Sequence, residues 1–179
     1  MARIPYPEKD TAPDDQRKAL EHLEQNSRRV LNMNRLMSYH PKALETFSPF
    51  YAAVVSGTLD PKLRELAYIR TAMVNRCEYC EQAHRTLGRR AGLTDQQLAD
   101  LVGYESSVAY TPAEKSVLRY AEELTRTAQV NDGTFAEVAA HLTSAHIVEL
   151  NLVVAIANFT NRFNMGLGID VDTRPLPKA

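Results

Sequence analysis

Both cysteines of the 179-residue chain lie in one short segment, RCEYCEQAHR at 76–85. Cys77 and Cys80 are three residues apart, and His84 follows Cys80 by four. On a helix these spacings bring the three side chains onto one face, because residues three and four apart are neighbours. A thiolate is a nucleophile, a second thiol can capture an oxidised first one, and an imidazole exchanges protons near neutral pH. The segment therefore has the residue types that thiol redox chemistry needs.

The start of a helix would favour the charged form of a cysteine. Asn75 is a residue type that caps helices, and Glu78 follows it by three residues, as in a capping box. The sequence thus predicts a helix capped by Asn75, with Cys77 in its first turn. Unpaired backbone N–H groups there favour a thiolate, and thiol pKa values fall from about 8.5 to roughly 3.5–7.5 in such surroundings. Helix-end electrostatics alone favour Cys77 over Cys80 as the more acidic thiol.

A carboxylate in the preceding helix is a further candidate. Glu65 shares a predicted helix face with Tyr68, Ile69 and Ala72. A carboxylate on a mostly apolar face is either a desolvated functional acid or a structural group with a partner. Periodicity alone favours the structural interpretation, with Lys62, three residues earlier, as a partner at the surface.

Two other interpretations of the cysteines are open. A metal would find three ligands in Cys77, Cys80 and His84, but a closed structural zinc site needs four, and the sequence has no second Cys/His pair. The cysteines could also be inert, because free cysteine is commonly buried.

Composition and charge indicate a cytoplasmic protein. Hydrophobic residues make up 44% of the chain, charged residues 24%, and the formal net charge is −1, which suits one domain with a sizeable core. Lys and Arg are scattered, so the sequence predicts no nucleic-acid partner and no anionic-membrane partner. The longest apolar run, LVVAIA at 152–157, is too short to span a bilayer, and the N-terminal segment lacks the apolar core of a signal peptide. In a reducing cytoplasm a C-x-x-C pair is more often redox-active or metal-binding than structural.

Helical periodicity dominates the pattern along the chain. Three prolines predict an extended arm over residues 1–13. A first helix is predicted from about Asp14 past Leu23, with further turns towards Met33. The segment HPKALETFSPFYAAVVSG at 40–57 then has the apolar spacing of a buried helix face.

Prolines and caps mark the ends of the following helices. Pro49 should kink the helix within 40–57 or start a new one, with Ser48 as its cap. Asp60 is placed to cap a helix that begins at Pro61. Capping boxes are predicted at two later starts, formed by Thr94 with Gln97 and by Thr111 with Glu114.

The last long helix is predicted over 144–166, after a shorter one over 132–142. It is apolar on almost every side between Leu150 and Phe159. Such a helix is normally buried all round, either at the centre of the fold or against another subunit. The sequence shows no alternating strand pattern, so the predicted fold class is all-α.

Together, Glu65, Cys77, Cys80 and His84 form the pattern E-x11-C-x-x-C-x3-H. This pattern and the segment around it, LDPKLRELAYIRTAMVNRCEYCEQAHRTLGRRAGLTDQQLADL, resemble the alkylhydroperoxidase D-like branch of the carboxymuconolactone decarboxylase superfamily. The later segments TPAEKSVLRYAEEL and ELNLVVAIANFTNRFNMGLGI resemble the closing helices of that family. The resemblance is strongest over residues 41–169.

The resemblance implies a fold and an activity. The fold would be a single all-helical domain over residues 14–179 that assembles as a homo-oligomer, a trimer or a hexamer. The activity would be that of a thiol-dependent hydroperoxidase, an antioxidant oxidoreductase that acts on a small hydroperoxide. A dithiol or a thioredoxin-like protein would reduce the enzyme again, and no cofactor or metal is implied.

The resemblance also implies a role for each residue of the pattern. By position, Cys80 would be the peroxidatic cysteine and Cys77 the resolving one, while His84 and Glu65 would form the proton relay. The sequence departs from the best-described members at Tyr79, where they have a second histidine immediately before the second cysteine. A tyrosine, with a pKa of about 10, can hydrogen-bond there but does not exchange protons near neutral pH.

Other functions for the same residues are kept as alternatives. The pair could act as a redox sensor or in disulfide exchange, without peroxide turnover. A metal-binding or a decarboxylase-like protein is a weaker alternative, and the decarboxylase branch does not carry the cysteine pair.

Overall fold

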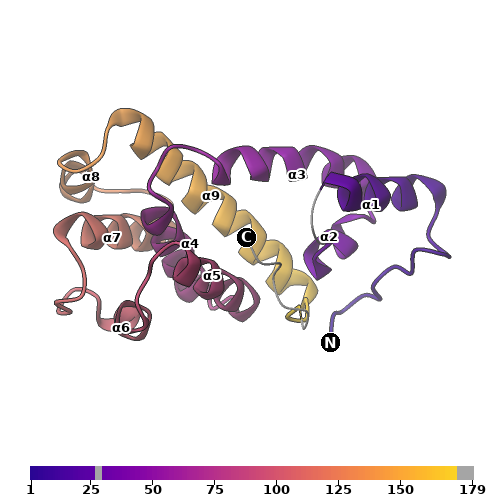
Figure 1. The fold of residues 1–179 in the computed structure, drawn as a ribbon, viewed down its shortest axis with the longest axis horizontal. Helices are drawn as coiled ribbons and strands as arrows, with labels where there is room; N and C mark the ends of the chain where they lie inside the picture. The colour runs from indigo at the N-terminus through magenta and orange to yellow at the C-terminus, as the bar shows by residue number, and fades with distance from the viewer. Residues whose placement is uncertain (27–29, 173–179) are drawn as a thin grey trace. The chain divides into compact units, whose positions relative to one another are not determined.

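The computed structural model describes residues 1–26 and 30–172, and this part of the chain is helical without any strand (Figure 1). The predicted all-α class is confirmed for it. The helices are α1 Asp14–Asn26, α2 Asn32–Met37, α3 Pro41–Val55, α4 Pro61–Asn75, α5 Glu78–Arg90, α6 Asp95–Asp100, the short 3-10 helix η1 Leu101–Gly103, α7 Pro112–Thr127, α8 Asp132–Ala139 and α9 Ser144–Leu167.

The described residues form two compact units. One unit contains residues 1–26, 30–53 and 163–172, and the other contains residues 54–162. The predicted boundaries, an arm over 1–13 and one domain over 14–179, stay a prediction, and the end of that range lies outside the described residues.

In the first unit, helix α1 starts at Asp14 as predicted and ends at Asn26. The further turns predicted towards Met33 fall in part on residues 27–29, which lie outside the described residues. The core of this unit is made by the side chains of Ala19, Leu20, Leu23, Met37 and Leu44.

Helix α3 is continuous through its proline. Pro49 lies inside the helix, so the alternative in which Pro49 starts a new helix after a Ser48 cap is wrong. The helix therefore tolerates the loss of one backbone N–H donor in its interior, which is the usual cost of a proline at such a position.

The predicted caps of α4, α6 and α7 in the second unit are confirmed. Asp60 accepts a hydrogen bond of 2.7 Å from the backbone N–H of Lys62 at the start of α4. Capping boxes at the starts of α6 and α7 are formed by Thr94 with Gln97 and by Thr111 with Glu114. These caps pair backbone N–H groups that a helix start would otherwise leave without partners.

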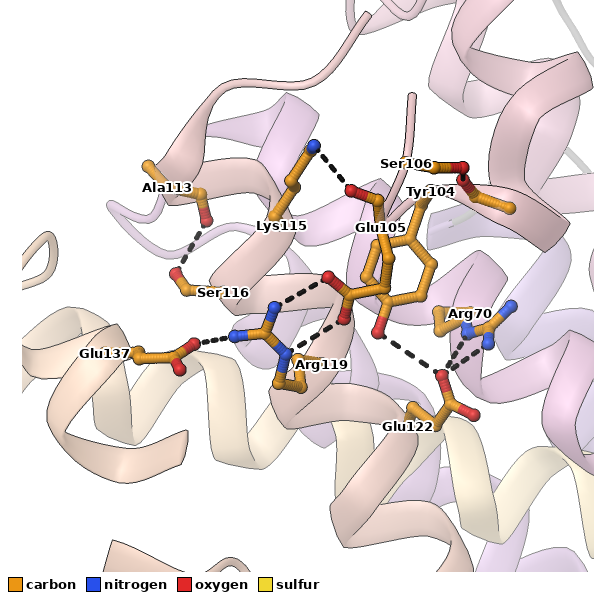
Figure 2. A network of polar contacts seen from close by, with 11 residues as sticks. Arg70, Tyr104, Glu105, Ser106, Ala113, Lys115, Ser116, Arg119, Glu122 and Glu137 are labelled. Atoms are coloured by element: carbon orange, nitrogen blue, oxygen red, sulfur yellow. Dashed lines mark hydrogen bonds and ion pairs between the residues drawn. The ribbon is translucent and has the colours of Figure 1, made fainter. Parts of the chain in front are cut away.

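Helix α4 is the element on which this unit is built, because it packs against both α5 and α7. A polar network holds α4 to its neighbours (Figure 2). In that network Arg70 of α4 donates to the Glu122 carboxylate of α7 and, over 3.1 Å, to the Leu101 carbonyl. The Tyr104 hydroxyl also donates to Glu122. These bonds fix the position of α4 along α7.

Helix α9 has a buried side and an exposed side. Leu150, Val153, Val154 and Ala157 are buried, whereas Leu152 and Phe159 are 37% and 50% exposed. For the exposed side, burial at the centre of the fold or against another subunit stays a prediction. No helix in residues 1–26 or 30–172 is long and apolar enough to cross a membrane.

Candidate active site

The chain reverses between α4 and α5 through one residue in the left-handed region. Arg76 has a φ of 60°, and the backbone N–H of the next residue, Cys77, donates 2.9 Å to the Ala72 carbonyl. This is a helix C-terminus closed by a 6→1 hydrogen bond. The C-terminus of α4 therefore determines the position of Cys77.

The predicted cap of α5 is wrong. Asn75 is the last residue of α4, and its side-chain amide donates to the Asn158 and Asn161 side chains of α9 instead. Cys77 itself is the N-cap residue of α5, without a side-chain cap hydrogen bond. The reason is that α4 continues to Asn75 and turns only at Arg76, which moves the start of α5 two residues along the chain.

The two thiols lie together in the interior. Cys77 Sγ and Cys80 Sγ are 2.8 Å apart, both are thiols rather than members of a disulfide, and the exposed fractions of the two residues are 2% and 3%. The Cys80 thiol, as a hydrogen-bond donor to the Cys77 thiolate, lowers the pKa of Cys77. Burial opposes this effect, the Cys80 backbone N–H adds to it, and the net pKa of Cys77 is below its usual value.

Glu65 and His84 form a second buried pair. Glu65 Oε2 lies 2.7 Å from His84 Nδ1, and the two residues are 4% and 6% exposed. A carboxylate can only accept, so Nδ1 carries the hydrogen and Nε2 is the ring nitrogen left for proton exchange. Arg64 makes a longer contact of 3.4 Å with the other Glu65 oxygen.

Lys62 is not the partner of Glu65. Its Nζ lies 2.7 Å from Glu114 Oε1 on α7. The interpretation of Glu65 as a surface carboxylate paired with Lys62 is therefore wrong. Lys62 is three residues before Glu65, but the capping carboxylate of α7 is the acceptor that it reaches.

Tyr68 is a neighbour of the pair for which the sequence suggested no role. Its ring lies flat against the His84 imidazole, with centroids 3.4 Å apart and planes inclined by 10°. Its hydroxyl lies 2.6 Å from Thr160 Oγ1 of α9. The available signal was the i, i+3 spacing from Glu65, which places Tyr68 beside the acid on the same face of α4.

The structure thus brings the four predicted residues together as two pairs. Glu65 meets His84 across the α4–α5 interface, and Cys77 meets Cys80 at the start of α5. Cys80 and His84 are one turn apart on α5, so the pairs share a helix face. Within the described part of the chain, no three His, Cys, Asp or Glu side chains gather as a metal would require.

A match to a known protein family covers the four predicted site residues. Residues 41–123 match the Carboxymuconolactone decarboxylase family, a range that contains Glu65, both cysteines and His84. This match is consistent with the predicted resemblance to the alkylhydroperoxidase D-like branch of that superfamily. Among curated relatives, the uncharacterized protein YdfG of Bacillus subtilis (strain 168) is 26% identical over 141 residues, which are 76% of this chain and 96% of YdfG.

Two of the solved structures with a similar fold have names that refer to different activities. The alkylhydroperoxidase AhpD core of an uncharacterized peroxidase-related protein from Ralstonia eutropha JMP134 has a TM-score of 0.78 at 23% identity, over 96% of this chain and 93% of that chain. A variant of the debrominase Bmp8, in complex with 2,3,4-tribromopyrrole, has a TM-score of 0.80 at 17% identity, over 97% of this chain and 95% of that chain. At these identities the likeness establishes the fold.

Proposed function

We propose that this protein is a thiol-dependent hydroperoxidase in which Cys80 attacks the peroxide and Cys77 resolves the product. The observation that carries the proposal is the buried hydrogen bond of 2.7 Å between Glu65 and His84, on the helix face that also holds both thiols. A buried carboxylate that accepts from one imidazole nitrogen fixes the tautomer and leaves the other nitrogen basic, as in catalytic Asp–His pairs. The family match and the AhpD-like fold are consistent with this activity.

The first step begins with proton transfer from Cys80 Sγ to His84 Nε2, one helical turn away. The thiolate attacks one peroxide oxygen, the S–O bond forms and the O–O bond breaks. The leaving oxygen takes a proton and departs as alcohol, or as water from hydrogen peroxide. Sulfur is oxidised to a sulfenic acid, and the peroxide is reduced. Glu65 stabilises the imidazolium while it holds the proton.

The second step uses the other thiol. The Cys77 thiol lies next to Cys80 and gives up its proton as it becomes the resolving nucleophile. It attacks the Cys80 sulfur, the S–S bond forms, the S–O bond breaks, and the hydroxide takes a proton and leaves as water. A 2.8 Å separation of the sulfurs means that little movement is needed.

Reduction of the disulfide completes the cycle. An external dithiol, either a small molecule or a thioredoxin-like protein, attacks the Cys80 sulfur, the S–S bond breaks and Cys77 leaves as a thiolate. The second thiol of the donor then attacks the donor sulfur of the mixed disulfide, which releases Cys80 and leaves the donor oxidised to a disulfide.

The protein is further proposed to act as a homo-oligomer, a trimer or a hexamer. Val148, Leu152 and Phe159 are 61%, 37% and 50% exposed in the single chain. Their spacing of four and seven residues places them on one side of α9. An apolar row of this kind is suited to cover by a second copy.

The test compares hydroperoxide consumption by the wild type, Cys80→Ser and Cys77→Ser with a dithiol reductant. Turnover by the wild type that is lost in Cys80→Ser supports the proposal. Equal rates in those two proteins would remove Cys80 as the nucleophile. A reversible disulfide without turnover would instead identify a redox sensor. Because the debrominase Bmp8 shares the fold, a brominated pyrrole belongs in the same assay as a second oxidant of the thiol pair.

A further inference from the structure

Two side chains contact the His84 ring, and a third anchors one of them. Glu65 binds Nδ1 in the plane of the ring, and Tyr68 covers one face of the ring at a centroid distance of 3.4 Å. Thr160 in turn binds the Tyr68 hydroxyl. Glu65 and Tyr68 are three residues apart on α4, so one helix face supplies both the acceptor and the stacking surface.

The direction of the outer hydrogen bond follows from the contacts of Thr160. Its Oγ1 lies 3.1 Å from the Ile156 carbonyl and 3.0 Å from the Ala157 carbonyl, both in the preceding turn of α9. A hydroxyl has one hydrogen, and the carbonyls can only accept it. Thr160 therefore accepts from Tyr68, and the Tyr68 hydroxyl is a donor fixed to α9. The phenol is 2% exposed and the threonine 1%, so water does not compete for this bond.

We infer that Tyr68 is a positioning residue for His84, anchored by Thr160. A single hydrogen bond at Nδ1 leaves the imidazole free to tilt about the axis through that bond. A ring packed flat against one face, with planes inclined by 10°, removes this tilt. The two restraints together give Nε2 one direction. Proton transfer is sensitive to such placement, because a shift of about 1 Å at a reacting group can cost on the order of 100-fold in rate.

The stack also serves both protonation states of the imidazole. A phenol face packs against a neutral imidazole, and it attracts an imidazolium through a cation–π interaction. The ring therefore stays in place while a proton arrives at Nε2 and leaves again. The catalytic consequence rests on the proposed function, whereas the restraint on the ring does not.

The experiment measures the mobility of the His84 ring directly. With ring-labelled histidine, ¹³C and ¹⁵N relaxation reports how far the imidazole reorients, and two-bond ¹⁵N–¹H spectra report its tautomer. All variants are expected to keep the hydrogen at Nδ1, because Glu65 still accepts it. Tyr68→Leu is expected to show a more mobile ring than the wild type and a loss of hydroperoxide-dependent thiol oxidation of about 10- to 100-fold. Tyr68→Phe, which keeps the ring, and Thr160→Val, which removes the acceptor at similar volume, should lie between Tyr68→Leu and the wild type.

Tyr120→Leu is the matched control. Tyr120 is 4% exposed, and its hydroxyl lies 2.9 Å from Asn151 Oδ1 of α9, so it is a buried tyrosine with the same kind of anchor. It should lose stability as Tyr68→Leu does and keep the wild-type His84 signal. If Tyr68→Leu does not fold, Tyr68→Met supplies the ring-free side chain.

The outcomes separate the two proposals. An unchanged ring mobility in the ring-free Tyr68 variant overturns the positioning role, whatever the wild type does with peroxide. A more mobile His84 ring in that variant, with Tyr120→Leu unchanged, supports it. If the wild type fails to turn over hydroperoxide while its His84 ring is rigid, the proposed function fails and the restraint on His84 stands.

Discussion

The carboxylate of Glu65 on α4 and the imidazole of His84 on α5 meet through one hydrogen bond of 2.7 Å, in a place where neither side chain is more than 8% exposed. The pair joins two helices that pack side by side, and it lies on the face that carries the C-x-x-C thiols. Leaving a buried acceptor of this kind without a hydrogen-bond partner is costly in free energy, because an unpaired buried polar group loses its hydration without compensation. The pairing is thus both a structural bond and the element that defines which imidazole nitrogen is free.

Glu65→Gln tests the charge of this pair at nearly constant shape. The amide oxygen can still accept from Nδ1, but it does not stabilise an imidazolium as a carboxylate does. Because general acid–base catalysis contributes about 10²–10⁴-fold, we expect peroxide-dependent oxidation of the thiols to fall at least 10-fold. Stopped-flow kinetics with a hydroperoxide measures this rate.

The control for that variant is Glu114→Gln. Glu114 is also a buried carboxylate, but it bonds to Lys62 and Gln97 rather than to His84. It should lower stability and leave the rate of thiol oxidation unchanged. An equal loss of rate in both variants would mean that Glu65 acts through folding alone.

The acidity of Cys77 depends on Cys80. Because a donor at Cys80 lowers the pKa of Cys77, Cys80→Ala is expected to raise that pKa, and Cys80→Ser, which keeps a hydroxyl donor, to raise it less. Thiolate absorbance near 240 nm follows the titration of the single remaining cysteine. Identical titrations of the Ala and Ser variants would contradict the role of the Cys80 side chain.

The lowered pKa of Cys77 also predicts how the stability of the folded protein changes with pH. The folded pKa of Cys77 lies below its usual value, so the folded reduced protein binds fewer protons than the unfolded chain in that window. The resulting stability is complete above the usual thiol pKa of about 8.5, and it is lost as the pH falls through the lowered pKa. Urea unfolding of the reduced wild type and of Cys77→Ala, from neutral to mildly alkaline pH, should diverge in this direction.

Chemical trapping assigns the order of attack. In Cys77→Ser the sulfenic acid formed by a hydroperoxide cannot be resolved, so a dimedone-type probe should label Cys80. In Cys80→Ser the labelling of Cys77 should be much slower, because Cys77 lacks the imidazole one helical turn away. Mass spectrometry of the labelled peptides decides between the two cysteines. Predominant labelling of Cys77 in the wild type would reverse the proposed roles.

The sequence was sufficient for the parts of the fold that depend on local chemistry. Asp60, Thr94 and Thr111 cap helices as predicted, because a cap is decided by a few neighbouring residues. The prediction at Asn75 was wrong because two helix ends compete there, and the left-handed turn at Arg76 decides in favour of a longer α4. A single sequence window does not contain that competition.

In the candidate site, too, features within one helix could be predicted from the sequence, whereas contacts between helices could not. The spacing of Cys77, Cys80 and His84 on one helix was readable, since it is a property of one element. Whether Glu65 paired with Lys62 or with His84 depended on which helix packs beside α4, and periodicity has no information on that. The stack of Tyr68 on His84 and its anchor at Thr160 join three helices, and such contacts between distant segments become visible only in the folded chain.

The molecular mass of the protein in solution tests the proposed assembly through α9. We expect multi-angle light scattering to give three or six copies, and Leu152→Glu or Phe159→Glu to shift the protein towards smaller species, because a charge at a covered apolar row is costly to desolvate. Val102→Glu is the control, since Val102 is 79% exposed and lies on η1 rather than on α9. A monomeric wild type, or an equal effect of Val102→Glu, would contradict the assignment of this face.

The polar network that positions α4 should contribute to stability in a pH-dependent way (Figure 2). Burial raises the pKa of Glu122, but hydrogen bonds from Arg70 and Arg126 more than offset this, and the net pKa is lowered. The stability from this pair is therefore present above the usual glutamate pKa of about 4.3 and is lost as the pH falls through the lowered value. Arg70→Met should cost about 1–3 kcal/mol at neutral pH, the Arg70 side chain being 10% exposed and that of Glu122 22%.

Arg119 provides the comparison within the same network, because it is also an arginine in ion pairs, with Glu105 and Glu137, but is 34% exposed, with Glu105 51% exposed. Arg119→Met should cost no more than about 1 kcal/mol, since solvent screens exposed ion pairs. Urea unfolding at pH 7 and at a pH well below the usual glutamate pKa of about 4.3 measures both variants. The difference between Arg70→Met and the wild type should shrink as the pH falls through the lowered pKa of Glu122, because the carboxylate then loses its charge in the folded wild type as well. A difference that stays constant with pH would show that Arg70 stabilises α4 by packing and by its bond to the Leu101 carbonyl, and not through the charge of Glu122.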